Sequence, residues 1–194
     1  RVSHLFYVSS INKSISYLND LEFLEYSNVQ FYINEFGFKE LINSLSNKIR
    51  LTHLDINKFD YSNWEDGTDK NFRMALSKLI NLTYLDLSGF NAPGNALLNT
   101  VQALDRLNKI THLIIDKSNL GTDTAIELSK ALERMPNLIH LSLQSNVIDT
   151  KGYIELFTRL PNTSNFIYLD LNFNSFRDET KQISKVLMNM KNIV

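Results

Sequence analysis

A short pattern of apolar and polar residues recurs along the chain. Apolar side chains hold its first, fourth and sixth positions, as in residues 51–56 (LTHLDI) and 138–143 (LIHLSL). Alternation with a period of two places the fourth and sixth side chains on one face of a strand. The pattern occurs without gaps at residues 51–56, 82–87, 110–115, 138–143 and 166–171, clearly again at 21–26, and more weakly at 2–7. It predicts a series of short strands, each buried on one face.

The segments between these strands change to a helical period. Residues 96–104 and 125–132 carry apolar side chains at spacings of three and four, which is typical of a helix with one buried stripe. Asn95 and Asp123 stand where a helix N-cap is useful. A single unit cannot bury its apolar side, but stacked neighbours can. Because strands and helices differ in width, we expect the stack to curve with the strands inside.

The repeat resembles the leucine-rich repeat, L-x-x-L-x-L-x-x-N-x-L, and the last three starts, 28 residues apart, resemble its ribonuclease-inhibitor-like class. The resemblance implies a right-handed α/β solenoid with a concave parallel sheet and convex helices. We expect one domain over residues 1–194. The chain opens at Arg1 and ends at 192–194 as if another repeat began, so we expect a piece of a longer protein. The first two matches start only 19 residues apart, which is too short for the same strand-and-helix unit, so the register of residues 1–20 stays open.

In this family the ninth position usually carries an asparagine that bonds to backbone groups of adjacent turns. Asn146 and Asn174 match it, and Ser118 is a polar substitute. Phe59 and Phe90 depart from it, and we expect their rings to stack on each other. Leu113 should lie in the middle of the core.

The third position of the repeat is aromatic or histidine throughout. It reads His4, Phe23, His53, Tyr84, His112, His140 and Tyr168, and includes every histidine of the chain. Adjacent strands lie about 4.8 Å apart, so these rings should form a ladder. Acidic residues hold most fifth positions (Glu25, Asp55, Asp86 and Asp170), and the seventh and eighth positions add Asn57, Lys58, Asp116, Lys117, Asn172 and Phe173.

Two explanations fit the ring column. Flat side chains stack well across parallel strands, or they form a rigid contact surface of the kind that carries binding energy. The predicted partner-binding residues are Phe23, His53, Asp55, Tyr84, Asp86, His112, Asp116, His140, Tyr168, Asp170 and Phe173. Such a wall favours a partner with basic and apolar features, and histidine protonation near pH 6–7 would tune its affinity.

The composition argues against several other classes of function and partner. A net charge of −1 gives no general attraction to phosphate backbones, so we expect no nucleic-acid partner. The absence of cysteine excludes disulfides and thiolate metal sites and suits a reducing compartment. We expect a soluble protein without membrane insertion, because no apolar run reaches about 18 residues. The insertion around Trp64 is expected to fold onto the helices, or else to form a second contact loop.

No catalytic motif is present, so we expect no enzyme within these residues, no cofactor and no small-molecule substrate. There is no nucleophile elbow and no glycine-rich phosphate loop. A metal site of His112, His140 and Asp86 is a weak alternative. The sequence favours a protein–protein interaction module. Its style resembles leucine-rich-repeat effectors that intracellular bacteria secrete into the host cytoplasm. The alternatives are a GTPase-regulating or scaffold protein, or the recognition part of an enzyme whose catalytic domain lies elsewhere.

Overall fold

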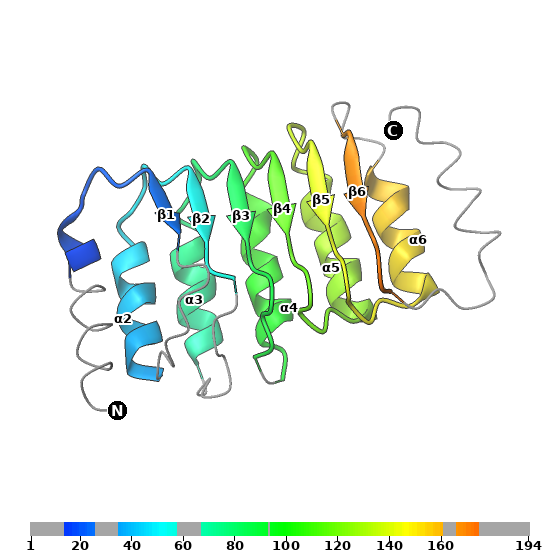
Figure 1. Cartoon of the computed structure of the whole chain (residues 1–194), viewed down its shortest axis with the longest axis horizontal. Coiled ribbons are helices and arrows are strands. Elements are labelled where there is room, and N and C mark those ends of the chain that lie inside the picture. Colours follow the sequence, from blue (N-terminus) through cyan, green and yellow to red (C-terminus); the bar gives the residue numbers. More distant parts are fainter. Residues whose placement is uncertain (1–13, 26–34, 58–66, 93, 161–165, 175–194) are drawn as a thin grey trace.

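In the part of the chain that the structure describes, six strands form one parallel sheet in chain order (Figure 1). A computed structural model describes residues 14–25, 35–57, 67–92, 94–160 and 166–174. The strands are β1 (Phe23–Glu25), β2 (His53–Asp55), β3 (Tyr84–Asp86), β4 (His112–Ile114), β5 (His140–Ser142) and β6 (Tyr168–Asp170). Equal repeat positions pair throughout, as in Leu85 with Leu113 and Leu113 with Leu141. The six strands predicted from residue 21 onward and their common register are confirmed, while the weaker match at residues 2–7 lies outside the described residues.

The helices lie on one side of this sheet (Figure 1). They are α2 (Glu35–Leu45), α3 (Thr68–Leu76), α4 (Ala96–Val101) with the 3₁₀ helix η1 (Gln102–Arg106), α5 (Thr122–Leu132) and α6 (Thr150–Arg159). Figure 1 shows the helices set more widely apart than the strands, so the stack bends toward its sheet. The open face of the sheet is therefore the concave one, and we call it the sheet face. In the described part of the chain, no helix is long and apolar enough to cross a membrane.

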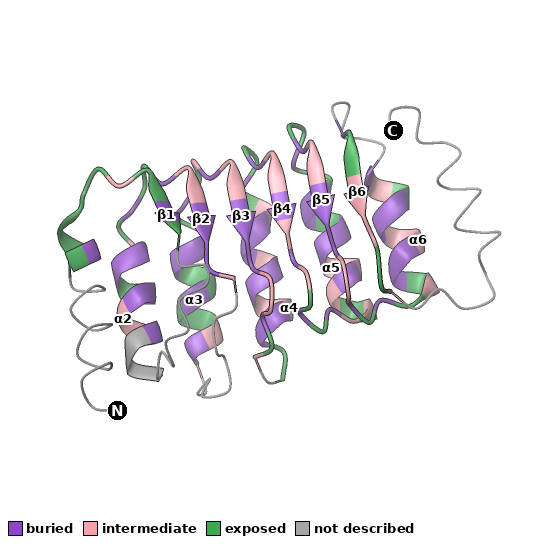
Figure 2. Ribbon diagram, viewed as in Figure 1, coloured by how far each residue is buried: buried purple, intermediate pink, exposed green. Residues whose placement is uncertain are grey.

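The core fills the space between the sheet and the helices (Figure 2). Leu113 of β4 is fully buried, as predicted, together with Leu85 and Leu141 of the adjoining strands. Phe90 is also buried and stacks on Phe72 of α3, with ring centroids 6.1 Å apart. Its predicted partner, Phe59, lies outside the described residues.

The ninth-position asparagine bonds as the repeat pattern implies. Asn146 Oδ1 accepts hydrogen bonds from the backbone N–H groups of Ser118 and Leu120, at 3.1 and 3.0 Å. Its Nδ2 donates to the carbonyl oxygens of Ile115 and Leu143, at 2.6 and 3.0 Å. One buried amide thus satisfies four backbone groups from two repeats.

Ser118 does part of the same work. Its hydroxyl accepts from the backbone N–H of Phe90 at 3.1 Å and lies 3.2 Å from the carbonyl oxygen of Leu87 and 2.9 Å from that of Asp116. A hydroxyl has a single proton to donate, so it reproduces the asparagine network only in part.

One of the two predicted helix starts differs in the structure. Helix α5 begins at Thr122 with Gly121 as its N-cap, so the prediction that Asp123 caps it is wrong. Asp123 instead lies in the first turn, where a carboxylate favours the helix dipole. Asn95 does occupy the N-cap of α4 but makes no side-chain capping bond. Asp149, which sequence reasoning overlooked, caps α6 by accepting from the Gly152 N–H at 2.9 Å.

Candidate functional site

A continuous row of rings crosses the sheet face. The ring ladder consists of Phe23, His53, Tyr84, His112, His140 and Tyr168, one from each strand. The fourth-position leucine of each strand faces the core, so the third-position side chain points the other way. Neighbouring rings are stacked across all five strand pairs. The predicted ladder is confirmed over these strands, while His4 lies outside the described residues.

The ladder is divided at His112. The ring centroids of Phe23–His53 and His53–Tyr84 are 3.9 and 4.0 Å apart, and those of His140–Tyr168 are 4.2 Å apart. His112 is looser, at 6.0 Å from Tyr84 and 5.4 Å from His140. Two tight stacks therefore flank a histidine that is less constrained by its neighbours.

A threonine accounts for the position of His112. The Thr111 hydroxyl donates to the Thr83 carbonyl oxygen at 2.9 Å. The Thr111 hydroxyl oxygen also lies 2.9 Å from His112 Nδ1. Because the hydroxyl proton is already used, Nδ1 must be the donor in the neutral imidazole. His112 Nε2 is then left as a hydrogen-bond acceptor. Threonine also stands at the second position of the two preceding repeats, where each hydroxyl donates to the repeat before it.

Stacking decides which parts of the rings can meet a partner. The faces of the inner rings are covered by their neighbours, so a partner meets ring edges, the Tyr84 and Tyr168 hydroxyls and the imidazole nitrogens. The end rings are the most open, with Phe23 55% and Tyr168 46% exposed. Ring edges carry the positive end of the aromatic quadrupole. They suit carbonyl oxygens as well as apolar groups.

The acidic row beside the ladder is less open than the sequence suggests. Asp55 and Asp86 lie on the sheet face, but each is only 7% exposed. Asp55 Oδ1 accepts from the Asn57 N–H at 3.0 Å, and Asp86 Oδ1 accepts from the Ser88 N–H at 2.8 Å. The Asn57 Nδ2 donor bridges the two carboxylates, 3.3 Å from each. These aspartates hold the turns after β2 and β3, and little of either remains for a partner.

Asp116 and Asp170 also bond locally. Asp116 Oδ1 accepts from the Ser142 hydroxyl at 2.7 Å and from the Gln144 N–H at 2.8 Å, yet burial raises the pKa of this carboxyl above its ordinary value. Asp170 Oδ1 accepts from the Asn172 N–H at 2.9 Å. Both residues remain partly exposed, unlike Asp55 and Asp86.

Phe173 is the most open large apolar side chain among the described residues, at 83% exposure. It occupies the eighth position of the repeat, where the backbone turns through a positive φ. Glycine meets this requirement at residue 89, but Lys117, Ser145 and Phe173 adopt φ values of 52°, 56° and 57°. A bulky residue in this region is strained, so the turn presents the Phe173 ring to solvent at an energetic cost.

The ladder's environment shifts its titrating groups. Burial lowers the pKa of His53, against the opposing charges of Glu25 and Asp86. Burial and the neighbouring His112 lower the pKa of His140. Burial raises the pKa of Tyr84 to about 12, with smaller contributions from nearby carboxylates. The neutral forms of these rings are therefore favoured in the folded chain.

We expect the free energy of unfolding to fall as the pH drops from about 7.5 to about 5.5. His53 and His140 bind protons less readily in the folded chain than in the unfolded chain, where the pKa is about 6.5. The stabilising effect of the two neutral histidines is complete at pH values above the unfolded pKa. It is lost as the pH falls toward their lower pKa values in the folded chain. Urea denaturation over this range should show the slope. The same slope in a His53→Gln/His140→Gln variant would exclude this cause.

Comparison with known proteins finds similarity among solved structures only. No protein-family model matches the chain, and no curated protein matches it. Among solved structures, a leucine-rich-repeat protein of Leptospira interrogans has 14% identity and a TM-score of 0.48 over 94% of this chain and 50% of its own. Internalin C2 of Listeria monocytogenes has 18% identity and a TM-score of 0.44 over 96% of this chain and 89% of its own. The actin-binding site 2 of leiomodin-1 has 12% identity and a TM-score of 0.46 over 65% of this chain and 87% of its own.

The fold is a leucine-rich-repeat solenoid. With identities this low and TM-scores below 0.5, that assignment rests on the chain's own repeat, strand register and asparagine bonding. For the alternative of a metal site at His112, His140 and Asp86, the described residues contain no group of three or more His, Asp or Glu side chains that could hold a metal ion.

Proposed function

We propose that this chain is a protein-recognition module that holds its partner on the sheet face. One observation carries the proposal, namely the ladder of six rings. Its rings stack in two tight groups on either side of His112, on strands that are paired in register. Aromatic side chains fixed before binding lose little conformational freedom and dominate many interfaces. Six strands at about 4.8 Å spacing, together with the turns that follow them, offer a contact wall, and a standard interface takes roughly 800 Å² per partner.

The chemistry of this wall defines the partner's contact surface. Glu25, Asp116 and Asp170 remain partly or fully exposed around the rings, which favours basic groups on the partner. The acceptor at His112 Nε2 favours a hydrogen-bond donor opposite the middle of the ladder. The open Phe173 ring favours an apolar contact at the β6 end. Protonation of the histidines would place positive charge against a basic partner, so affinity should weaken as the pH falls.

The finer proposal is that the chain is a non-catalytic effector of an intracellular bacterium and that its partner is a protein of the host cytoplasm. Support comes from a composition rich in asparagine and free of cysteine, together with the irregular repeat lengths. A scaffold or GTPase regulator acting in its own cell, or a recognition part joined to a catalytic domain elsewhere, would use the same wall. The identity of the captured partner separates these cases.

A Tyr84→Ala/His112→Ala/His140→Ala variant should lose the partner while remaining folded. The three rings occupy adjoining strands at the centre of the ladder, where hot-spot residues usually gather. After capture of partners from host-cell lysate, affinity for the enriched partner should fall at least about tenfold, which corresponds to about 1.4 kcal/mol. Circular dichroism and thermal melting would establish that the variant is folded.

A matched control removes three exposed side chains elsewhere. Tyr17, Ile49 and Val147 are 72%, 58% and 58% exposed and lie off the ladder. Their triple alanine variant should bind like the wild type. Unchanged affinity in the ladder variant, or an equal loss in the control, would remove the sheet face as the binding site.

A further inference from the structure

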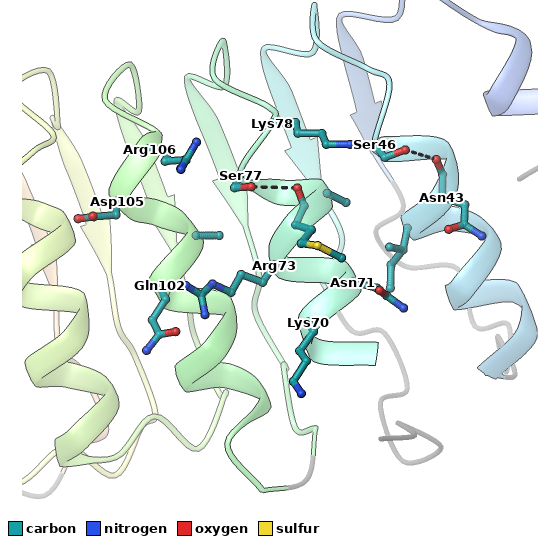
Figure 3. A pocket seen from close by; sticks show the side chains of 14 residues that line it. Asn43, Ser46, Lys70, Asn71, Arg73, Ser77, Lys78, Gln102, Asp105 and Arg106 are labelled. Carbon is teal, nitrogen blue, oxygen red and sulfur yellow. Dashed lines mark hydrogen bonds between the residues drawn. The ribbon is translucent and has the colours of Figure 1, made fainter. Parts of the chain in front are cut away.

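A second surface with a distinct chemistry lies on the helical side, opposite the ring ladder. A groove of ≈ 790 Å³ runs across α2, α3 and η1, and Figure 3 shows its lining. Four cationic side chains border it, Lys70, Arg73, Lys78 and Arg106. In Figure 3, Arg73 reaches from α3 toward Gln102 of η1, and Lys78 points toward Ser46 after α2. We call this surface the basic groove.

The cations of the basic groove differ from those on the neighbouring helices. Arg134 and Arg159 each form an ion pair with the preceding repeat, to Asp105 and Glu133, at 2.6 Å in both cases. Among the described residues, none of the four groove cations has a carboxylate within 4.0 Å. Asp105 is the one carboxylate among the described residues that line the groove, and Arg134 already binds it. Positive charge is therefore concentrated here in a chain whose net charge is −1.

The rest of the lining suits a peptide. Met74 is 57% exposed beside the cations and offers an apolar contact. The side-chain amides of Asn43 and Asn71 lie on the α2 side of α3, and that of Gln102 lies on its η1 side. All three can pair with a peptide backbone, which presents both donors and acceptors. The hydroxyls of Ser46 and Ser77 are instead used within their own helical turns.

Size and lining favour an extended protein segment over a nucleic acid. Packed helices lie about 8–10 Å apart, so a chain crossing from α2 to η1 covers roughly five or six extended residues at about 3.3 Å each. Single-stranded nucleic acids bind mainly by stacking bases on aromatic rings, and the described lining of the groove contains no ring. Arginine side chains bind carboxylates through two parallel hydrogen bonds.

We propose that the basic groove binds an extended, acidic segment of a protein, with an apolar residue between its carboxylates to contact Met74. Arg73 and Arg106 would hold the carboxylates. Because the groove and the ring ladder occupy opposite walls of the solenoid, the chain can hold two segments at once. This proposal does not depend on the ladder being a binding site.

The test is a selection from a displayed library of random twelve-residue peptides on the full chain. Binders are counter-selected on an Arg73→Glu/Arg106→Glu variant, which removes peptides that bind the sheet face. The enriched peptides should be rich in Asp and Glu and should contain an apolar residue. The affinity of a synthetic binder, measured by fluorescence anisotropy, should fall at least tenfold in the groove variant and also fall as salt is raised.

The control variant carries an equal change in charge away from the groove. Lys130→Glu/Lys151→Glu alters exposed positions on α5 and α6 and should change the affinity less than threefold. A peptide with Gln in place of each Asp and Glu should not bind. The proposal is overturned by selection without acidic enrichment, by equal losses in the two variants, or by a twelve-nucleotide RNA binding the groove more tightly than the selected peptide.

Discussion

Replacing Leu113 by alanine should lower the free energy of unfolding by about 2–5 kcal/mol. Leu113 is fully buried on β4 and pairs with Leu85 on one side and Leu141 on the other. Truncation removes its apolar contacts and leaves a cavity between neighbours that the sheet holds in place. A loss of this size is a large share of the roughly 5–15 kcal/mol that stabilises a typical domain. Urea denaturation followed by circular dichroism measures it directly.

Ile167 provides the matched surface control for this substitution. It precedes β6 and is 54% exposed, so Ile167→Ala should change the free energy of unfolding by no more than about 0.5 kcal/mol. If both variants resist urea like the wild type, the fourth-position leucines do not form the core.

The Asn146→Ala variant should lose about 2–4 kcal/mol of the free energy of unfolding. The substitution strips partners from the Ser118 and Leu120 N–H groups and from the carbonyl oxygen of Ile115. A buried backbone group without a hydrogen-bond partner loses more free energy than a hydrogen bond contributes to stability when it forms. The midpoint of urea unfolding should therefore move well below that of the wild type.

Serine at the same position gives the informative comparison. Asn146→Ser should be less destabilising than Asn146→Ala, because Ser118 shows that a hydroxyl can keep part of this bonding one repeat earlier. Asn137 lies on the surface, with one long bond of 3.4 Å to the Asn108 carbonyl oxygen, and its alanine variant should be near neutral. Equal stabilities for all three variants would mean that the asparagine network contributes little.

Local pattern was enough to predict the strands, their register and the ring ladder. The alternation around Leu85, Leu113 and Leu141 leaves only one face for the core, and a slip by one residue would expose every leucine. Once those leucines align, the third-position rings must align as well. The bonding of Asn146 followed from the family pattern for the same reason, since its position in the repeat determines its surroundings.

Features that depend on neighbouring repeats could not be predicted in this way. The burial of Asp55 and Asp86 results from bonds across two turns, including the shared Asn57 amide. The cap of α5 depends on where its backbone begins to coil, one residue before Asp123.

The basic groove shows the same limit more clearly. Arg73 and Arg106 belong to different repeats and stand far apart in the sequence. Neither residue carries a local signal, because only helix packing brings them to one surface.

The ninth-position bonds also determine how this molecule can lose its structure. The backbone N–H of Phe90 donates to the Ser118 hydroxyl, and that of Ser118 donates to the Asn146 side chain. The backbone N–H of Asn146 donates in turn to the Asn174 side chain, and each of these bonds crosses one repeat boundary. Each turn thus depends on its successor to complete its backbone bonding. Melting a single inner turn would strand polar groups on the turn before it, so these repeats should unfold as one cooperative unit with strong nearest-neighbour coupling.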